Sequence, residues 1–401
     1  MTLHLYVFLC NLSIVKISSI VSIVKCDDYS SDCVRRAVRQ AIELAGLGDA
    51  FSSGSRVLLK PNLLSARDPR DAVTTHPVVV QIAGEIAISR GASVSVGDSP
   101  PFSGENPGSY AKLCDKTGMS EVAHQLGCDV VRFEENVVNV PNPQGRFFHT
   151  FEIARAAVES DIVVNIPKLK THGLTGFSGA VKNIFGCIPG IRKGLFHAQA
   201  AEDRETFAQM LVDLLGAIRP PINILDAVVA MEGEGPNAGS PRQIGLILAS
   251  SDPVALDAVA CAIVGIDPMS IDTTRLADEQ ELGCGRLSDI EIRGAKIESV
   301  HVPDFKQSSG KNQWANIPYP IRQALRRQMV PSPKINSNIC IGCGDCAKVC
   351  PVHAIQPGKP PIIDLTACIR CYCCHEVCNP HAIELKRGWL GRLLFQLRRK
   401  K

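Results

Sequence analysis

The sequence has little excess charge of either sign. Its 401 residues include 43 Lys and Arg and 40 Asp and Glu, for a formal net charge of +3 at pH 7. This balance excludes a general nucleic-acid binder, which needs a strongly basic surface. Hydrophobic residues make up 45% of the chain and charged residues 21%, a composition that excludes disorder as the main state. At about 150 residues per domain, the length predicts two or three domains.

Long hydrophobic runs are also lacking. No stretch reaches the roughly 20 apolar residues that a membrane-spanning helix needs. Residues 3–15 are mostly apolar, but Asn11, Ser13 and Lys16 interrupt or end the run. A signal peptide would carry a basic segment before such a run, and none is present here. We therefore interpret residues 1–18 as an N-terminal extension or a spare strand.

Between residues 19 and 303, short apolar runs alternate with stretches of helical period. This alternation predicts an α/β domain whose large, mainly parallel sheet is flanked by helices. Residues 137–153 differ, because two extended segments around a Pro-Asn-Pro-Gln-Gly turn predict a hairpin. The predicted strands cover 21–25, 56–60, 93–98, 129–133, 161–167, 222–231 and 244–250. The predicted helices cover 34–45, 109–126, 203–217, 253–264 and 272–283, with one more that opens at His76-Pro77.

The rest of the chain divides into three further segments. Residues 304–336 are rich in Pro, Ser, Asn and Gln, which predicts a linker. Residues 337–385 form a small Cys-rich domain with an internal repeat of 28 residues. Residues 386–401 carry seven Lys or Arg and no acidic residue, mixed with apolar side chains. That composition suits a basic amphipathic tail that contacts an anionic membrane surface or an acidic partner; the alternative is a solvated terminal helix.

Seventeen cysteines are present, and eight of them follow a repeated C-x2-C-x2-C-x3-C spacing. In two-cluster ferredoxins, three such cysteines bind one 4Fe-4S cluster and the fourth binds the other cluster. Structural zinc also uses C-x-x-C pairs, but it does not explain the third and trailing cysteines. The sequence therefore predicts a small α+β ferredoxin-like domain with two 4Fe-4S clusters. The predicted ligand sets are Cys340, Cys343, Cys346 and Cys378 for one cluster, and Cys368, Cys371, Cys374 and Cys350 for the other.

Two details depart from the usual repeat. Cys373 lies beside Cys374, and Cys378 is followed by Asn379-Pro380, whereas Cys350 is followed directly by proline. Two neighbouring clusters pass single electrons, so electron transfer is the favoured use, with a purely structural role as the alternative. Such clusters need reduced thiols, which favours a reducing, cytoplasmic compartment.

A glycine-rich segment, residues 165–190, follows a predicted strand of the large domain. It contains Lys168, Lys170, His172, Lys182 and Asn183, but neither a P-loop nor a G-x-G-x-x-G fingerprint. Glycines let a ligand approach the backbone, and lysines favour an anion such as a carboxylate or phosphate. The alternative is a long structural loop whose lysines are solvated.

Other strand ends also carry polar residues. Because open α/β sheets bind ligands at the carboxyl ends of their strands, these groups are candidates for one cleft. Asp226 lies on a further predicted strand, and Glu232 and Glu234 follow it. For each single one of these polar residues, a cap or turn role is the alternative. Asp252-Pro253 is most simply a helix cap, and Cys187 a packed thiol. The candidate catalytic residues are His76, His172 and Lys182. The candidate substrate-binding residues are Lys60, Asn62, Asp98, Lys168, Lys170 and Asn183.

The motifs KPNLL, TTHP, GDSP, the segment 165–190, DAVVAMEGEGP and ASSDPVALDAVA together resemble the family known as domain of unknown function 362. The two cysteine motifs resemble the ferredoxin module of its iron-sulfur members. The resemblance covers nearly the whole chain from about residue 20. It implies iron-sulfur binding and leaves the substrate open.

Three classes of function follow from these observations. The leading hypothesis is an iron-sulfur oxidoreductase or electron-transfer protein, with a redox partner protein or a small anionic substrate and no nucleic acid. In it, lysines bind the anion and His76 or His172 transfers protons. The second is a non-redox metal enzyme, since the His and Lys pattern is faintly similar to the nickel-pincer lactate racemases. The third is a ferredoxin fused to a docking or cluster-delivery module.

Overall fold

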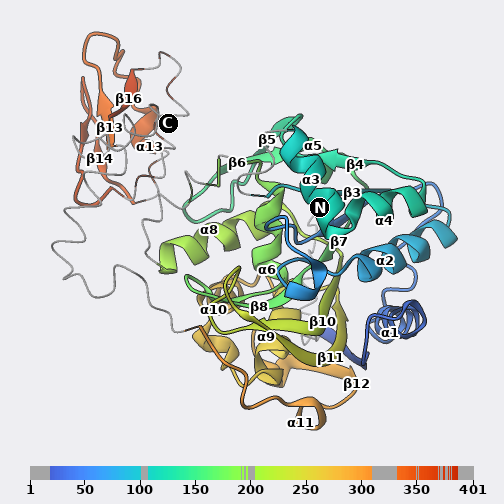
Figure 1. Cartoon of the computed structure of the whole chain (residues 1–401). Helices are drawn as coiled ribbons and strands as arrows, with labels where there is room; N and C mark the ends of the chain where they lie inside the picture. The colour runs from blue at the N-terminus through green and yellow to red at the C-terminus, as the bar shows by residue number, and fades with distance from the viewer. Residues whose placement is uncertain are drawn as a thin grey trace, which may run out of the picture.

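A computed structural model gives the structure of the chain in two parts, a large sheet domain and a small C-terminal domain (Figure 1). The predicted extension 1–18 lies outside the described residues, as do 309–331 of the predicted linker and 387–401 of the tail. No helix in the described part of the chain is long and apolar enough to cross a membrane. The residues described are 19–100, 107–190, 192–193, 196, 204–308, 332–348, 350, 352–368, 370, 374, 378, 380 and 382–386.

The large domain is built on a ten-stranded sheet. Strands β10, β7, β2, β3 and β4 are parallel, whereas β11 is antiparallel to both of its neighbours, β10 and β1. Strand β8 pairs in parallel with β10 and antiparallel with β9. The predicted α/β class with a mainly parallel sheet is therefore confirmed. The order is β12 (Ile290–Gly294), β1 (Ser19–Lys25), β11 (Ser240–Ser250), β10 (Ile222–Glu232), β7 (Ile162–Ile166), β2 (Arg56–Pro61), β3 (Ser93–Asp98) and β4 (Val130–Arg132), with β8 (Lys168–His172) and β9 (Gly176–Ser178) beside β10.

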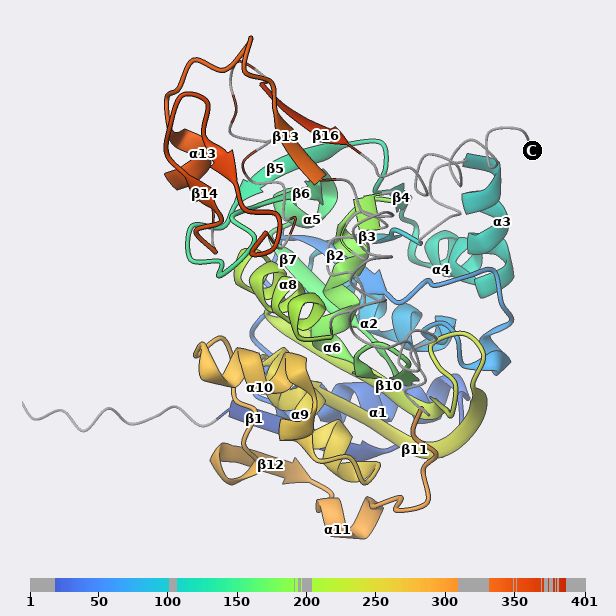
Figure 2. The same cartoon turned by 90° about the vertical axis from the view of Figure 1, so that its left-hand side faces the viewer.

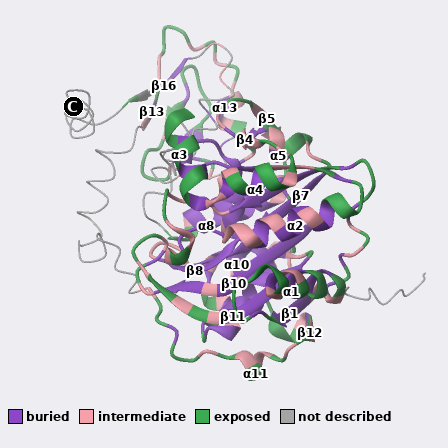
Figure 3. Cartoon of the chain, turned by 45° about the vertical axis from the view of Figure 1, so that its right-hand side comes forward, coloured by how far each residue is buried: buried purple, intermediate pink, exposed green. Residues whose placement is uncertain are grey.

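Helices cover both faces of this sheet. Side chains alternate between the faces of a strand, so Leu59 packs in one core cluster with α1 and α2, while Leu58 packs in another with α8. Figure 2 shows α6, α8, α9 and α10 on the side facing the viewer, with α1 and α2 behind the sheet. Figure 3 shows the buried residues concentrated in the strands between these layers. The helices are α1 (Ser31–Leu44), α2 (Pro77–Ser89), α3 (Pro107–Thr117), α4 (Met119–Leu126), α5 (Arg155–Glu159), α6 (Ala180–Asn183), α8 (Arg204–Ala217), α9 (Pro253–Ile263), α10 (Asp272–Glu279) and α11 (Ile297–Val300).

Two of these helices begin where the sequence predicts, at Asp252-Pro253 and at His76-Pro77, and Asp252 is the cap expected there. Asp252 accepts hydrogen bonds from the amides of Val254 (2.8 Å) and Ala255 (3.1 Å), and Pro253 follows it as the first residue of α9. His76 caps α2 in the same way, with Pro77 next in the chain. Proline suits this first position because its missing N–H has no partner there in any helix. The predicted hairpin also forms, as β5 (Val137–Pro141) antiparallel to β6 (Thr150–Ala154).

The segment 165–190 corrects one alternative. It is not a long loop with solvated lysines, because Lys168 and Lys170 lie on strand β8 and each is 1% exposed. After β9 the chain enters α6 and the short 3-10 helix η2 (Ile184–Cys187). Residues two apart on a strand point to the same face, so β8 presents both lysines on one side. Three more 3-10 turns complete the domain, η1 (Pro69–Asp71), η3 (Pro268–Ser270) and η4 (Leu287–Asp289).

The strand order places a topological switch between β2 and β7. From β2 the chain crosses through α2 to β3 on one side, whereas from β7 it crosses through α8 to β10 on the other. In open α/β sheets, ligands bind outside the carboxyl ends of the strands at such a switch. This edge of the sheet is therefore where a functional site is expected.

The small domain consists of two similar halves, which follow the 28-residue cysteine repeat. Strand β13 (Ser332–Ile335) pairs with β16 (Ile383–Lys386), and β14 (Ile355–Gln356) pairs with β15 (Ile362–Ile363), with α13 (Asp345–Lys348) between. The pairs Ile335–Ile383 and Ile355–Ile363 correspond to each other under the 28-residue repeat. Strand β13 begins within the segment assigned to the linker, so this sheet starts before residue 337.

Candidate functional site

A buried ion pair lies at the carboxyl ends of β2 and β3. Lys60 is fully buried and Asp98 is 3% exposed, and the Nζ of Lys60 lies 2.8 Å from Oδ1 of Asp98. The other carboxylate oxygen accepts a hydrogen bond from the amide of Leu63 at 2.7 Å. Buried charges are tolerated when they are paired and hydrogen-bonded in this way.

Gly186 in η2 lies directly against this pair. A Cβ atom at that position would lie 1.9 Å from Oδ1 of Asp98 and 2.5 Å from Nζ of Lys60. Any residue with a side chain would displace one of the two charged groups. Glycine is therefore required at position 186, because the backbone of η2 lies too close to the ion pair to leave room for a Cβ atom.

A second ion pair joins β8 to β10. The Nζ of Lys168 lies 2.9 Å from Oδ2 of Asp226, and both side chains are fully buried. The hydroxyl of Tyr29 donates to Oδ1 of Asp226 at 2.8 Å and accepts from Lys168 at 2.7 Å. The backbone amide of His76 donates to Oδ2 at 2.9 Å. Asp226 thus connects the segment after β1, the start of α2 and strand β8.

His76 stacks on Tyr29. Their ring centroids are 3.6 Å apart with an interplanar angle of 7°. Burial is the main cause that lowers the pKa of His76 to about 4; Asp226 opposes this shift and the nearby Lys168 contributes to it. The imidazole is therefore neutral near pH 7, which is the form that accepts a proton.

Lys170 has no carboxylate partner among the described residues. Its Nζ donates to Oδ1 of Asn62 at 2.6 Å and to the carbonyl of Val73 at 2.8 Å. Burial lowers the pKa of Lys170 well below its ordinary value, with further contributions from Lys182 and Lys168. An anion beside this amine would restore its charged form.

Two more lysines belong to the same electrostatic group. Burial lowers the pKa of Lys182 to about 8, and repulsion from Lys60 adds to this effect. Burial also lowers the pKa of Lys193 to about 8, although Asp98 opposes the shift. Lys182 is half-buried, with its Nζ 5.8 Å from the ring centroid of Phe185. The described ion pairs give neither lysine a carboxylate partner.

Lysines therefore outnumber carboxylates at this edge of the sheet. Five lysines (60, 168, 170, 182 and 193) face Asp98, Asp226 and the half-buried Glu134. Two buried polar atoms of neighbouring segments, Oγ1 of Thr74 and Oδ1 of Asn183, have no hydrogen-bond partner. Such orphaned atoms cost free energy unless water or a ligand satisfies them. The arrangement suits a small anion that also accepts or donates hydrogen bonds.

The structure brings most of the predicted large-domain residues together. Asn183 donates to the carbonyl of Lys60 at 3.3 Å and to Oδ1 of Asn165 at 2.8 Å. His172 is different, because its Nδ1 accepts from the amides of Leu174 (3.1 Å) and Thr175 (3.3 Å) in its own loop. These contacts place the proton of the neutral ring on Nε2. Glu232 lies apart from Asp226 and accepts from the amide of Lys306.

Sequence reasoning missed Tyr29, Lys193 and Gly186. Tyr29 and Asp226 are 197 residues apart in the chain, so no local pattern joins them. Gly186 lies inside the glycine-rich segment 165–190, and its residue type was the signal that a side chain would not fit there. Cys187 is fully buried, and burial raises the pKa of its thiol to about 11, which agrees with a packed cysteine.

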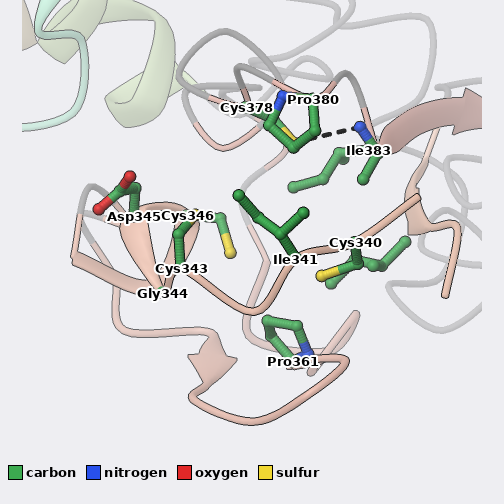
Figure 4. A pocket seen from close by; sticks show the side chains of 12 residues that line it. Cys340, Ile341, Cys343, Gly344, Asp345, Cys346, Pro361, Cys378, Pro380 and Ile383 are labelled. Atoms are coloured by element: carbon green, nitrogen blue, oxygen red, sulfur yellow. Dashed lines mark hydrogen bonds between the residues drawn. The ribbon is translucent and has the colours of Figure 1, made fainter. Parts of the chain in front are cut away.

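Four of the predicted iron ligands line one pocket in the small domain. Cys340, Cys343, Cys346 and Cys378 surround it together with Ile341, as Figure 4 shows. None of these four cysteines forms a disulfide. In the described residues, no three His, Cys, Asp or Glu side chains are placed to hold a single metal ion. The thiols and apolar walls fit a cluster held by thiolates.

Matching amide contacts occur in the two halves of the repeat. The amide of Ala354 donates to Sγ of Cys350 at 3.2 Å, and that of Ala382 donates to Sγ of Cys378 at 3.2 Å. The shifted proline after Cys378 therefore leaves this local backbone contact intact. Hydrogen bonds to cluster sulfurs are among the factors that set reduction potential.

The second predicted ligand set is described in part. Cys350, Cys368 and Cys374 share the core of the small domain with Ala354 and Ile383. Cys371 lies outside the described residues. The binding of iron by either set stays a prediction.

Comparison with known proteins supports an iron-sulfur site in the small domain. Residues 332–355 match a family described as a 4Fe-4S binding domain. A relative named thylakoid-associated protein sll1697, from Synechocystis sp., is 35% identical over 264 residues, which are 66% of this chain and 79% of that protein.

Two solved structures show a lower similarity. The lactate racemase apoprotein from Thermoanaerobacterium thermosaccharolyticum is 16% identical with a TM-score of 0.36, covering 59% of this chain and 55% of that one. A protein from Thermotoga maritima is 14% identical with a TM-score of 0.35, covering 57% of each chain. The chain thus spans little more than half the length of these two proteins.

The large domain gives the most extensive family match. Residues 57–262 match the model described as domain of unknown function (DUF362), and this range contains both buried ion pairs and the strands that carry them. The chain belongs to the DUF362 family, and its C-terminal part carries a 4Fe-4S binding domain.

Proposed function

We propose that this protein is an iron-sulfur electron-transfer protein that delivers electrons to an anionic substrate or cofactor in its large domain. The observation that carries the proposal is the pocket that Cys378 shares with Cys340, Cys343 and Cys346. A trailing cysteine that joins the other half's triplet is typical of two-cluster ferredoxins. The second cluster is assigned to Cys350, Cys368, Cys371 and Cys374.

The clusters supply one-electron transfer when they are bound. The chain's own contribution is to hold the thiolates, to donate amide hydrogen bonds to Cys350 and Cys378, and to surround the sulfurs with apolar side chains. These hydrogen bonds and the burial of the site adjust its reduction potential. The donor or acceptor outside the chain is a redox partner protein.

The large domain is proposed to bind a small carboxylate or phosphate. Lys170, Lys182 and Lys193 form no ion pair with a carboxylate in the described ion pairs, so an anion that binds beside them would stabilise their charged forms. Lys60 and Lys168 form buried ion pairs with Asp98 and Asp226. These pairs fix the positions of the two lysines, which stabilise the site. Asn62 and the unpartnered Thr74 hydroxyl offer hydrogen bonds to the same anion.

Proton transfer in this site is assigned to His76. Its ring is neutral near pH 7 and stacks on Tyr29, which holds its orientation. Both histidines accept an amide hydrogen bond on Nδ1, His76 from Val78 and His172 from its own loop. His172 is assigned a secondary role, because His76 also stacks on Tyr29 and its amide contacts Asp226 of the buried ion pair. A neutral, oriented imidazole accepts a proton when electron transfer changes the charge of the substrate.

The test combines spectroscopy with anion binding on the full chain purified without oxygen. Electron paramagnetic resonance after dithionite reduction is expected to show spin signals from two reduced clusters. Calorimetry with sulfate as the probe is expected to show binding that the double variant Lys170→Met, Lys182→Met weakens at least tenfold, while Lys296→Met on the surface leaves it unchanged. A protein without reducible clusters, or sulfate binding unchanged in the double variant, would contradict the proposal.

A further inference from the structure

The two halves of the small domain differ at one position of the repeat. Between the first two cysteines of the first half lies Gly342, and 28 residues later the same position holds Arg370. Both have a positive φ, +74° for Gly342 and +60° for Arg370. Glycine adopts this conformation freely, whereas a residue with a side chain adopts it at a cost. Arginine at such a position is therefore a candidate functional residue.

Arg370 is close to the second cysteine set. Its amide donates to Sγ of Cys368 at 3.4 Å, and it directly precedes Cys371 in the chain. The residue is only 3% exposed. Because a guanidinium stays protonated at every physiological pH, its positive charge is permanent.

The first pocket carries a different set of charges. Asp345 lines it (Figure 4), and the corresponding position of the second half is Cys373. The Nζ of Lys348 lies 3.0 Å from Asp345, and both side chains are about half exposed or more. The exposed side chain of Lys359 packs on Gly342. Solvent and salt screen these exposed charges far more than they screen a buried guanidinium.

We propose that Arg370 makes the cluster site of Cys350, Cys368 and Cys374 the more easily reduced of the two. A cluster gains one negative charge when it takes up an electron, and a buried positive charge nearby stabilises that reduced form. An electron that enters the small domain then resides at this site, and the site of Cys340, Cys343 and Cys346 passes electrons toward it. This inference rests on the proposed function, since it requires both clusters.

The test is a redox titration of the full chain, followed by electron paramagnetic resonance without oxygen. The natural protein is expected to show two midpoint potentials. Arg370→Gly, which installs the residue that the first half carries, is expected to lower the higher potential and to keep the iron content. Arg370→Gln removes the charge while keeping much of the side chain and is expected to shift the same potential in the same direction. Lys359→Gln removes an exposed charge at the first site and is expected to leave both potentials in place.

The outcomes separate this inference from the proposed function. Two clusters whose potentials stay unchanged in both Arg370 variants would overturn the inference alone. A shift confined to the lower potential would also overturn it. A natural protein with fewer than two clusters would overturn the proposed function, and this inference with it.

Discussion

Lys60 and Asp98 form a buried ion pair in which Nζ and Oδ1 are 2.8 Å apart. The pair joins the neighbouring parallel strands β2 and β3, next to the switch point between β2 and β7. It fixes one side of the lysine cluster, because each charged group holds the other in place. The remaining lysines of the cluster therefore lie beside a buried ion pair whose side chains are held in fixed positions.

The first prediction concerns the glycine that touches this pair. Gly186→Ala places a methyl group within 1.9 Å of Asp98 Oδ1, so the ion pair or η2 must shift. We expect a loss of about 1–3 kcal/mol in the free energy of unfolding, the usual cost of overpacking. Urea unfolding followed by circular dichroism measures this loss. Gly48→Ala is the matched control, because a Cβ there meets nothing within 4 Å, and its effect should stay within about 0.5 kcal/mol.

The second prediction concerns the ion pair between Lys168 and Asp226. Asp226→Asn leaves the fully buried ammonium of Lys168 without a counter-charge. Breaking a buried pair from one side costs about 3–5 kcal/mol, and we expect a thermal unfolding midpoint lowered accordingly. Asp161→Asn breaks the exposed pair with Arg56 and should change the midpoint far less. Equal effects of the two substitutions would contradict a structural role for Asp226.

The third prediction concerns pH. The pKa values of Lys182 and Lys193 are both lowered to about 8, so both amines are charged below pH 8 and lose their protons above it. Sulfate keeps its charge throughout this pH range, so any change in its affinity comes from titration of groups on the protein. We expect binding to weaken as the pH rises from 7 to 9.5, by about 1.5–3 kcal/mol, or roughly ten- to hundredfold. Calorimetry at several pH values measures it, and constant affinity would exclude these lysines from the site.

The fourth prediction concerns which cysteines share a cluster. If Cys378 belongs with the first triplet, Cys340→Ala and Cys378→Ala together damage one cluster and leave about four irons. Cys368→Ala with Cys378→Ala would then damage both clusters and leave almost no iron. Iron analysis of the two double variants, with Cys114→Ala as a control, distinguishes them. The opposite pattern would show that each half binds its own cluster.

The fold followed closely from the sequence where burial on both faces left continuous apolar runs. The strand Ile162–Ile166 is marked by its apolar run, and helix α9 is marked by the cap Asp252-Pro253. Both signals are local in the sequence, and both elements lie where the pattern predicts them. The antiparallel direction of β11 relative to its neighbours was not predictable, because an apolar run looks the same whether its strand is parallel or antiparallel. Charged residues are uncommon in strands, so the β8 pattern Lys-Leu-Lys-Thr-His gave no sign of a buried strand.

The candidate site was predictable only in part. Residues at strand ends could be selected by one general rule, that parallel strands carry ligands at their carboxyl ends. Tyr29 and Lys193 could not be found that way, since their contacts depend on how distant segments pack. The pairing of Cys378 with the first cysteine triplet around one pocket did follow from spacing, because the fourth cysteine lies too far along the chain to serve its own half.

Native mass spectrometry of the full-length protein, purified without oxygen, tests the central claim most directly. Two 4Fe-4S clusters should add the mass of about eight irons and about eight sulfides to the chain. The same count should survive in the Gly48→Ala control and fall in either cysteine double variant. A chain that carries zinc, or no added iron and sulfide under strict exclusion of oxygen, would contradict the account.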